Sequence, residues 1–167
     1  MRQIFTVIVL ACAFALAACA THDPNAPKEV IQLDMQVVAS AGVNPDNQKR
    51  PAPIVVTIYE LKTGSAFAAA DYFSLQDKDK TVLADDLVRR DQFQLRPGEK
   101  KSIQRKIDPA STKLGILAAY RDLPNSVWRV VYTLPTTPDA AWYNRTPKLK
   151  LTVDLDANAV NVNEPKQ

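Results

Sequence analysis

The sequence is poor in the residue types on which most active sites depend. It has one histidine, two cysteines and four glycines in 167 residues. His22 lies in a polar segment near the N-terminus, so a packed site cannot hold it against a nucleophile or a metal. The scattered glycines exclude a glycine-rich phosphate loop, and no serine stands in a nucleophile elbow. We therefore expect no enzyme, metal or cofactor, although two carboxylates distant in sequence could still meet in space.

The two cysteines cannot form a disulfide in the mature protein, because one lies in a predicted leader. Ile4 to Leu16 is an apolar run that suits a signal peptide and is too short for a permanent membrane span. It ends in Leu16-Ala17-Ala18-Cys19, the pattern that a lipoprotein signal peptidase needs. We expect residues 1–18 to be the signal peptide and Cys19 to be the lipidated new N-terminus. The alternative is an ordinary signal peptide with an incidental cysteine.

The residues after Cys19 predict where the lipid anchor resides. In enteric-type bacteria an aspartate after the lipidated cysteine retains a lipoprotein in the inner membrane. Here the residue is Ala20, which favours the periplasmic face of the outer membrane. Each buried methylene of an acyl chain contributes about 0.8 kcal/mol, so two or three chains anchor firmly. Residues 19–28 contain two prolines and little apolar surface, and we expect them to form a tether.

The charge of the chain is nearly balanced. Removing Arg2 with the leader lowers the formal charge from +3 to +2. A periplasmic protein meets no nucleic acid, so the short basic pairs, such as Lys100-Lys101 and Arg105-Lys106, suit solvated faces. An acidic partner surface or lipid head groups are the alternatives.

Alternating apolar and polar residues predict a mainly β domain over residues 29–163, with residues 164–167 as a polar tail. A reverse turn is expected at Arg96-Pro97-Gly98-Glu99. The predicted strands number about eight, which favours a two-sheet sandwich. They lie in Val30–Ala39, Ile54–Leu61, from Phe93 to the turn, and in Ile103–Ile107, Leu114–Tyr120, Val127–Leu134, Leu149–Leu155 and Ala159–Asn163.

Residues 65–90 interrupt the β pattern. Ser65 to Leu75 is rich in alanine and carries apolar residues at helical spacing, with Ser65 as the expected N-cap. Leu83 to Arg90 is expected to form a second short helix. Both faces of the strand Ile54–Leu61 are apolar, so something must cover the second one. We expect the helical insert to provide this cover.

The connection from Ser40 to Pro53 is long for a link between neighbouring strands. Its prolines reduce its conformational freedom and so lower the entropic cost of ordering it. Long ordered loops on rigid sandwiches often carry binding residues. A plain surface loop is the alternative interpretation.

Several segments behind the lipidation signal together resemble the TssJ family, the outer-membrane lipoproteins of the bacterial type VI secretion system. Their order and spacing carry the resemblance, which covers most of the mature chain. The segments are Asn44-Pro45-Asp46, Arg50 to Lys62, Phe67, Asp71 to Leu75, Leu95 to Glu99, Leu117 to Asp122, and Trp128.

The resemblance implies a transthyretin-like β-sandwich with extra helices. It also implies that the loop after the first strand contacts the periplasmic C-terminal region of TssM, an inner-membrane protein. TssJ, TssM and TssL would then form the membrane complex that anchors the contractile apparatus. By position the partner-binding residues would be Val43, Asn44, Pro45, Asp46, Asn47, Gln48, Lys49 and Arg50. Among these we expect Asn44, Asp46, Gln48, Lys49 and Arg50 to dominate.

A periplasmic lipoprotein that binds a small ligand or a glycan is the rival interpretation. Trp128, Trp142 and Tyr143 could stack on sugars. Trp128 falls on the apolar face of its strand, which favours core packing. Trp142 and Tyr143 lie in a polar loop and leave the question open.

Overall fold

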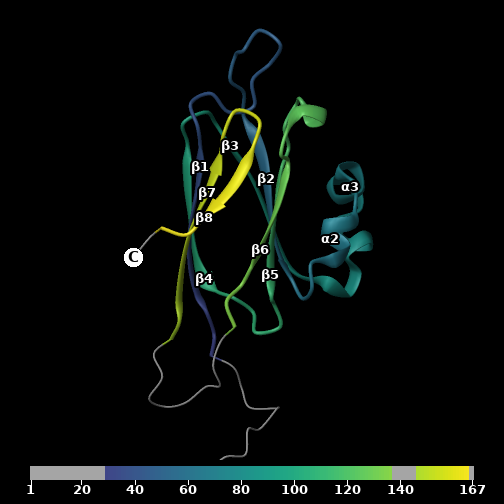
Figure 1. The fold of residues 1–167 in the computed structure, drawn as a ribbon, viewed down its shortest axis with the longest axis vertical. Coiled ribbons are helices and arrows are strands. Elements are labelled where there is room, and N and C mark those ends of the chain that lie inside the picture. Colours follow the sequence, from purple (N-terminus) through teal and green to yellow (C-terminus); the bar gives the residue numbers. More distant parts are fainter. Residues whose placement is uncertain (1–28, 137–145, 166–167) are drawn as a thin grey trace, which may run out of the picture.

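The computed structural model describes residues 29–136 and 146–165, which fold into two four-stranded sheets packed face to face (Figure 1). One sheet has the order β4-β1-β7-β8 and the other β3-β2-β5-β6. The prediction of a two-sheet sandwich with eight strands is confirmed. The strands are β1 Gln32–Ala39, β2 Ile54–Leu61, β3 Leu87–Leu95, β4 Lys100–Lys106, β5 Lys113–Ala118, β6 Arg129–Thr133, β7 Lys148–Leu155 and β8 Val160–Asn163.

The main core lies between the two sheets and follows the alternation in the sequence. In β1 the side chains of Leu33, Met35 and Val37 are fully buried, while the residues between them point outward. From the opposite sheet, Ile54, Val56 and Ile58 of β2 join the same cluster. Strand β1 pairs in parallel with β7 and antiparallel with β4, so it is central in its sheet.

A helical layer covers the outer face of one sheet. It consists of α2 Ser65–Ala69, α3 Tyr72–Leu83 and the 3₁₀ turn Ala84–Asp86, and it lies beside β2 and β5 in Figure 1. Tyr59 and Leu61 of β2 point to this side and pack against Phe67, Tyr72 and Leu75. The prediction that the insert covers the second face of β2 is confirmed.

The predicted second helix over Leu83–Arg90 is wrong. Helix α3 extends to Leu83, the chain turns at Ala84 with a φ of 43°, and β3 begins at Leu87. Leu87 and Arg90 pair with Leu61 and Tyr59 of β2. Backbone pairing at the edge of the sheet outweighs a weak helical spacing in so short a segment. The helical insert therefore ends at Asp86, not at Arg90.

The predicted N-cap at Ser65 is also wrong, because the insert contains two helices with different starts. Gly64, with a φ of 74°, precedes α2 and makes no side-chain cap. Asp71 caps α3, and its carboxylate accepts a hydrogen bond of 3.0 Å from the Ser74 N–H. The break at Ala70 separates the two helices.

The long connection from Ser40 to Pro53 joins β1 to β2, and these strands lie in opposite sheets. The turn at Arg96–Glu99 likewise joins β3 to β4 across the sandwich, with Gly98 at a φ of 79°. The two predicted strands flanking this turn are therefore not a paired hairpin. The first connection is therefore much longer than a crossing between the sheets requires, since the turn at Arg96–Glu99 makes such a crossing in four residues.

Candidate partner-binding site

The loop from Ser40 to Pro53 projects from one end of the sandwich (Figure 1). Strand β1 begins at the opposite end, where residue 29 is the first described residue. Eight extended residues span roughly 26 Å at 3.3 Å per residue. The loop therefore points away from the end at which the chain enters the domain.

The base of the loop is part of the folded core. The side chain of Val43 is fully buried in the cluster between the sheets. Asn44 is 4% exposed and sits at a φ of 51°, a left-handed conformation that asparagine tolerates better than most residues. Val43 and Asn44 therefore hold the loop in place and offer no free surface to a partner.

Asn44 connects three segments that are distant in the sequence. Its Nδ2 donates to the Pro53 carbonyl at 2.9 Å, and its Oδ1 accepts from the Arg121 N–H at 2.8 Å. Its own backbone N–H donates to the Ala157 carbonyl at 3.0 Å. The loop is thereby fixed to the connection after β5 and to the turn between β7 and β8.

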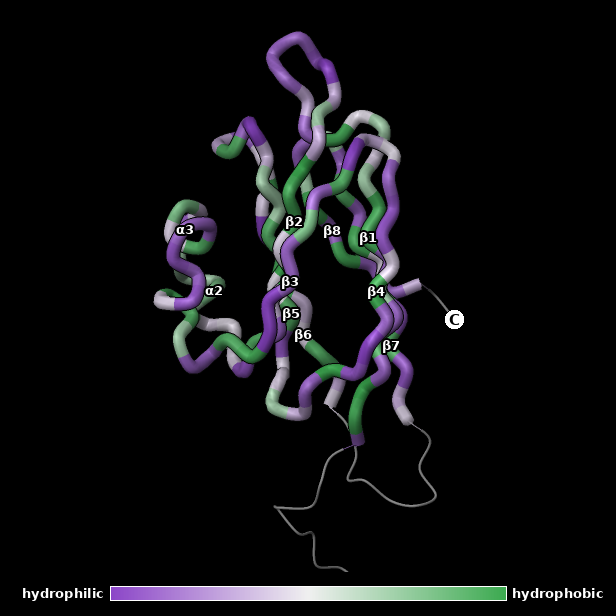
Figure 2. The backbone as a smooth tube through the Cα atoms, turned by 180° about the vertical axis from the view of Figure 1, so that it is seen from behind, coloured by the Kyte–Doolittle hydropathy of each residue, from purple (hydrophilic) through white to green (hydrophobic). Residues whose placement is uncertain are grey.

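The tip of the loop, residues 46–50, is closed by Asp46. One carboxylate oxygen accepts from the Gln48 and Arg50 backbone N–H groups at 2.9 Å each. The other accepts from the Arg50 Nε at 2.7 Å. Lys49 lies at a φ of 61°, which lets the chain reverse. The result is a small closed ring of hydrophilic residues, purple at one end of the molecule in Figure 2.

The side-chain hydrogen bond from Arg50 lowers the pKa of the Asp46 carboxyl below its usual value, so Asp46 is ionised at neutral pH. The Arg50 backbone N–H and the charge of Arg121 act in the same direction. A lowered folded-state pKa stabilises the closed tip above the unfolded pKa. That contribution is lost only as the pH falls through the folded pKa.

The eight predicted partner-binding residues thus divide into three groups by their exposure. Val43 and Asn44 are buried, Pro45 and Asp46 are half-buried, and Asn47, Gln48, Lys49 and Arg50 are exposed. The polar atoms of the Asn44 side chain are hydrogen-bonded within the fold, so the exposed residues of the tip are the better candidates for contact with a partner. Sequence reasoning missed the roles of Arg121 and Ala157, whose backbone groups anchor the loop and carry no side-chain signal.

Substituting Asn44 by alanine is expected to destabilise the domain by about 2 kcal/mol. The change removes two hydrogen bonds worth roughly 1 kcal/mol each and leaves a left-handed backbone under alanine. Asn47→Ala, in the exposed tip of the same loop, is the matched control and should be near neutral. Urea unfolding measures both. Equal stabilities for the two variants would contradict the role of Asn44.

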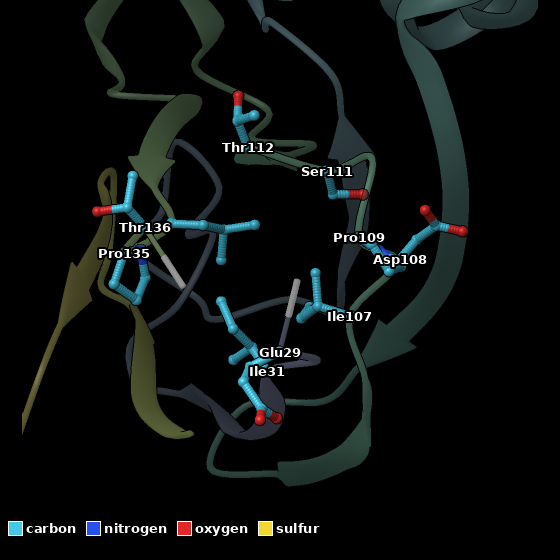
Figure 3. Close-up of a pocket in the computed structure, with 10 residues that line it drawn as sticks. Glu29, Ile31, Ile107, Asp108, Pro109, Ser111, Thr112, Pro135 and Thr136 are labelled. Carbon is cyan, nitrogen blue, oxygen red and sulfur yellow. The ribbon is translucent and has the colours of Figure 1, made fainter. Parts of the chain in front are cut away.

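A concavity with a volume of about 310 Å³ lies at the end of the sandwich opposite to the loop (Figure 3). Its lining combines aliphatic residues, such as Ile31 and Ile107, with polar or charged ones, such as Glu29, Asp108 and Ser111. No aromatic side chain lines it among the described residues.

Of the three aromatic residues that suggested a glycan-binding protein, only Trp128 lies within the described residues. Trp128 is half-buried and packs edge-on against Tyr72, with ring centroids 5.4 Å apart. This agrees with the prediction of core packing. Trp142 and Tyr143 lie outside the described residues, as does Cys19.

The buried carboxylates are paired with arginines. Glu60, 1% exposed, contacts the Arg105 Nε at 2.8 Å, and Arg105 also pairs with Asp91. Asp79 accepts from Arg90 and, at 3.1 Å, from the Tyr59 hydroxyl. Burial raises the pKa of Tyr59 to about 12, and the nearby Asp79 adds to this shift. These groups tie β2 to β4 and to α3, a structural arrangement.

Within residues 29–136 and 146–165 no group of three metal-ligating side chains gathers. None of the helices found there is long and apolar enough to cross a bilayer.

A family model described as "Type VI secretion lipoprotein, VasD, EvfM, TssJ" matches residues 31–158, most of the chain. The chain belongs to this family. The TssJ family consists of membrane-associated structural lipoproteins of type VI secretion and is not known for enzymes. No curated protein matches the chain.

Solved structures agree with the family assignment. The T6SS lipoprotein TssJ1 from Pseudomonas aeruginosa is 35% identical, with a TM-score of 0.74 over 83% of this chain and 98% of the other. Serratia marcescens Lip, described as a membrane-bound component of the type VI secretion system, is 26% identical, with a TM-score of 0.72 over 84% and 100%. The chain is thus similar to TssJ lipoproteins over nearly their whole crystallised length.

A third similar chain occurs in a structure described as "T6SS protein TssM C-terminal domain (869-1107) from EAEC". It is 25% identical, with a TM-score of 0.64 over 78% of this chain and 99% of the other. A chain with this fold therefore also occurs in a structure whose description names TssM.

Proposed function

We propose that this TssJ-family protein anchors the type VI membrane complex to the outer membrane by binding the periplasmic C-terminal region of a TssM-type protein. The observation that carries the proposal is the ordered polar tip at residues 46–50, which points away from the entry of the chain. A lipid anchor at one end and a binding loop at the other suit a protein that bridges a membrane and a periplasmic partner.

The anchor half of the proposal depends on the lipidation signal that ends at Cys19. Residues 1–18 are the leader in this proposal, and residues 19–28 are the tether. Acyl chains would insert in the inner leaflet of the outer membrane, since Ala20 replaces the aspartate that retains lipoproteins in enteric-type bacteria.

The partner half depends on rigidity as well as exposure. The tip is closed by the carboxylate of Asp46 and held at its base by Asn44, so little freedom is lost when a partner binds. The exposed residues Asn47 to Arg50 present donors and a positive charge to that partner. TssL would join indirectly, through TssM. The paired buried carboxylates favour a structural protein over an enzyme.

Co-purification tests the proposal. The full-length protein, solubilised from membranes in mild detergent, is expected to bring the TssM-type protein with it. High salt should weaken this association if Lys49 and Arg50 make charge contacts, because exposed charges are screened. Recovery of the folded lipoprotein without the TssM-type protein, from cells that contain both, would refute the proposal.

A further inference from the structure

The two most exposed large hydrophobic side chains of the described chain lie on two segments that pack against each other. Phe73 in the first turn of α3 is 64% exposed, and Val127, just before β6, is 54% exposed. Tyr72 links Phe73 to the segment that carries Val127, because its ring meets both the Phe73 ring and the ring of Trp128, the chain neighbour of Val127, at 5.4 Å, edge-on. Leu123 is half-buried against the same helical cluster. We call Leu123, Val127, Trp128, Tyr72 and Phe73 the apolar shelf.

The apolar shelf adjoins the base of the candidate loop. The connection that carries Leu123 and Val127, green in Figure 1, rises at the same end of the sandwich as the loop. The Val127 N–H donates to the Asn158 carbonyl at 2.9 Å, and the neighbouring Ala157 carbonyl accepts from Asn44. The Arg121 N–H donates to the Asn44 side chain. Backbone hydrogen bonds thus fix the shelf and the loop to each other.

The shelf is held rigidly from behind. The Arg129 guanidinium lies over the Trp128 ring, 4.6 Å from its centroid. One nitrogen of Arg129 also donates to the Phe67 and Ala70 carbonyls at 3.0 and 2.6 Å. Trp128 is therefore locked between β6 and the helical insert. A surface with fixed aromatic rings binds with little loss of conformational entropy.

The loop tip is too small to form a stable interface alone. A standard interface buries about 800 Å² on each partner and involves roughly 20–30 residues a side. The tip, residues 46–50, is polar throughout. Stable interfaces combine an apolar centre with a polar rim, so a partner held by the tip needs an apolar surface beside it. The shelf is the adjoining surface that provides it.

We propose that the partner captured by the loop also packs an apolar segment on the shelf, with Val127 and Phe73 as contact residues. The proposal rests on the proposed function and extends it. The partner has one continuous contact surface, with polar contacts at the tip and aliphatic or aromatic contacts on the shelf. Exposed apolar side chains beside polar residues are typical of a docking surface, and here they are Phe73 and Val127.

The test uses the full-length lipoprotein in mild detergent, titrated calorimetrically with the periplasmic C-terminal region of the TssM-type protein. Val127→Ser and Phe73→Ser are each expected to weaken binding at least tenfold and to make the heat-capacity change of binding less negative. Val131→Ser is the matched control. Val131 is 38% exposed and pairs with Gly115 in the middle of β5, so its variant should bind like the wild type.

Variants of the loop tip, titrated in the same way, separate this inference from the proposed function. If tip variants lose binding while the Val127 and Phe73 variants bind like the wild type, the shelf proposal is overturned and the proposed function stands. If the wild type itself does not bind, both fail. If sedimentation shows self-association that Val127→Ser removes, a second copy of this chain is the occupant, and the shelf proposal is overturned. Unchanged melting temperatures confirm that the exposed substitutions leave the fold intact.

Discussion

Replacing Asp46 to Arg50 with a short Gly-Ser link is expected to abolish capture of the TssM-type periplasmic region. The affinity should fall at least about a hundredfold, because the replacement removes every charged and hydrogen-bonding side chain that the tip offers to the partner. The melting temperature should hardly change, since the tip side chains are largely exposed and loop-closure entropy varies slowly with length. Calorimetric titration of both proteins measures the affinity, and thermal unfolding measures the stability.

The replacement must spare the base of the loop. Val43 is buried between the sheets and Asn44 is bonded to three segments, so removing the whole range from Val43 to Arg50 would also damage the core. Lys49→Glu and Lys150→Glu form a charge-matched pair of single substitutions. Both lysines are exposed, but Lys150 lies in β7 and pairs with Asp34 near the start of β1, at the end of the sandwich away from the loop. Only Lys49→Glu should weaken capture. A folded tip replacement that binds like the wild type would place the contact elsewhere.

Substituting Cys19 by serine is expected to remove the protein from the outer-membrane fraction entirely. The thiol is the only group in the mature chain that can accept the diacylglycerol, and acyl chains provide the whole membrane affinity in this account. Intact mass measurement should show acyl chains on the wild type and none on the variant. Membrane fractionation then reports the location of each protein.

Cys12→Ser is the matched control for the anchor. Cys12 lies inside the apolar run of the predicted leader, so its variant should be processed, lipidated and sorted like the wild type. If the Cys19 variant still fractionates with outer membranes, or if the wild type carries no acyl mass, the anchor assignment is wrong.

The strands could be predicted from the sequence because burial and alternation agree in them. The boundaries of β2 match the predicted Ile54–Leu61, since apolar residues on both faces mark a central strand with a covered outer face. The segment Leu87–Arg90 could not be predicted in this way. Its strand state depends on pairing with Tyr59 to Leu61, a contact more than twenty residues away that leaves no local pattern.

The candidate site could be predicted only in part. Length and prolines identified the loop from Ser40 to Pro53, but they could not separate its base from its tip. That division depends on which side chains reach across to other connections. Asn44 meets the backbones of Arg121 and Ala157, and a backbone group looks the same whatever residue carries it. The apolar shelf could not be predicted for the same reason. The segments that carry Phe73 and Val127 are brought together only in the folded protein, through the contact of Tyr72 with Trp128.

In the proposed role, one protein holds the membrane through Cys19 and the TssM-type partner through the opposite end of the sandwich. Vesicle flotation tests both halves together. Vesicles carrying the full-length lipidated protein are mixed with the soluble TssM-type periplasmic region and floated through a density gradient. We predict that the partner region floats with wild-type vesicles and stays at the bottom with vesicles that carry the Asp46–Arg50 replacement. The account is contradicted if the partner region fails to float with the wild type, or floats equally with the replacement.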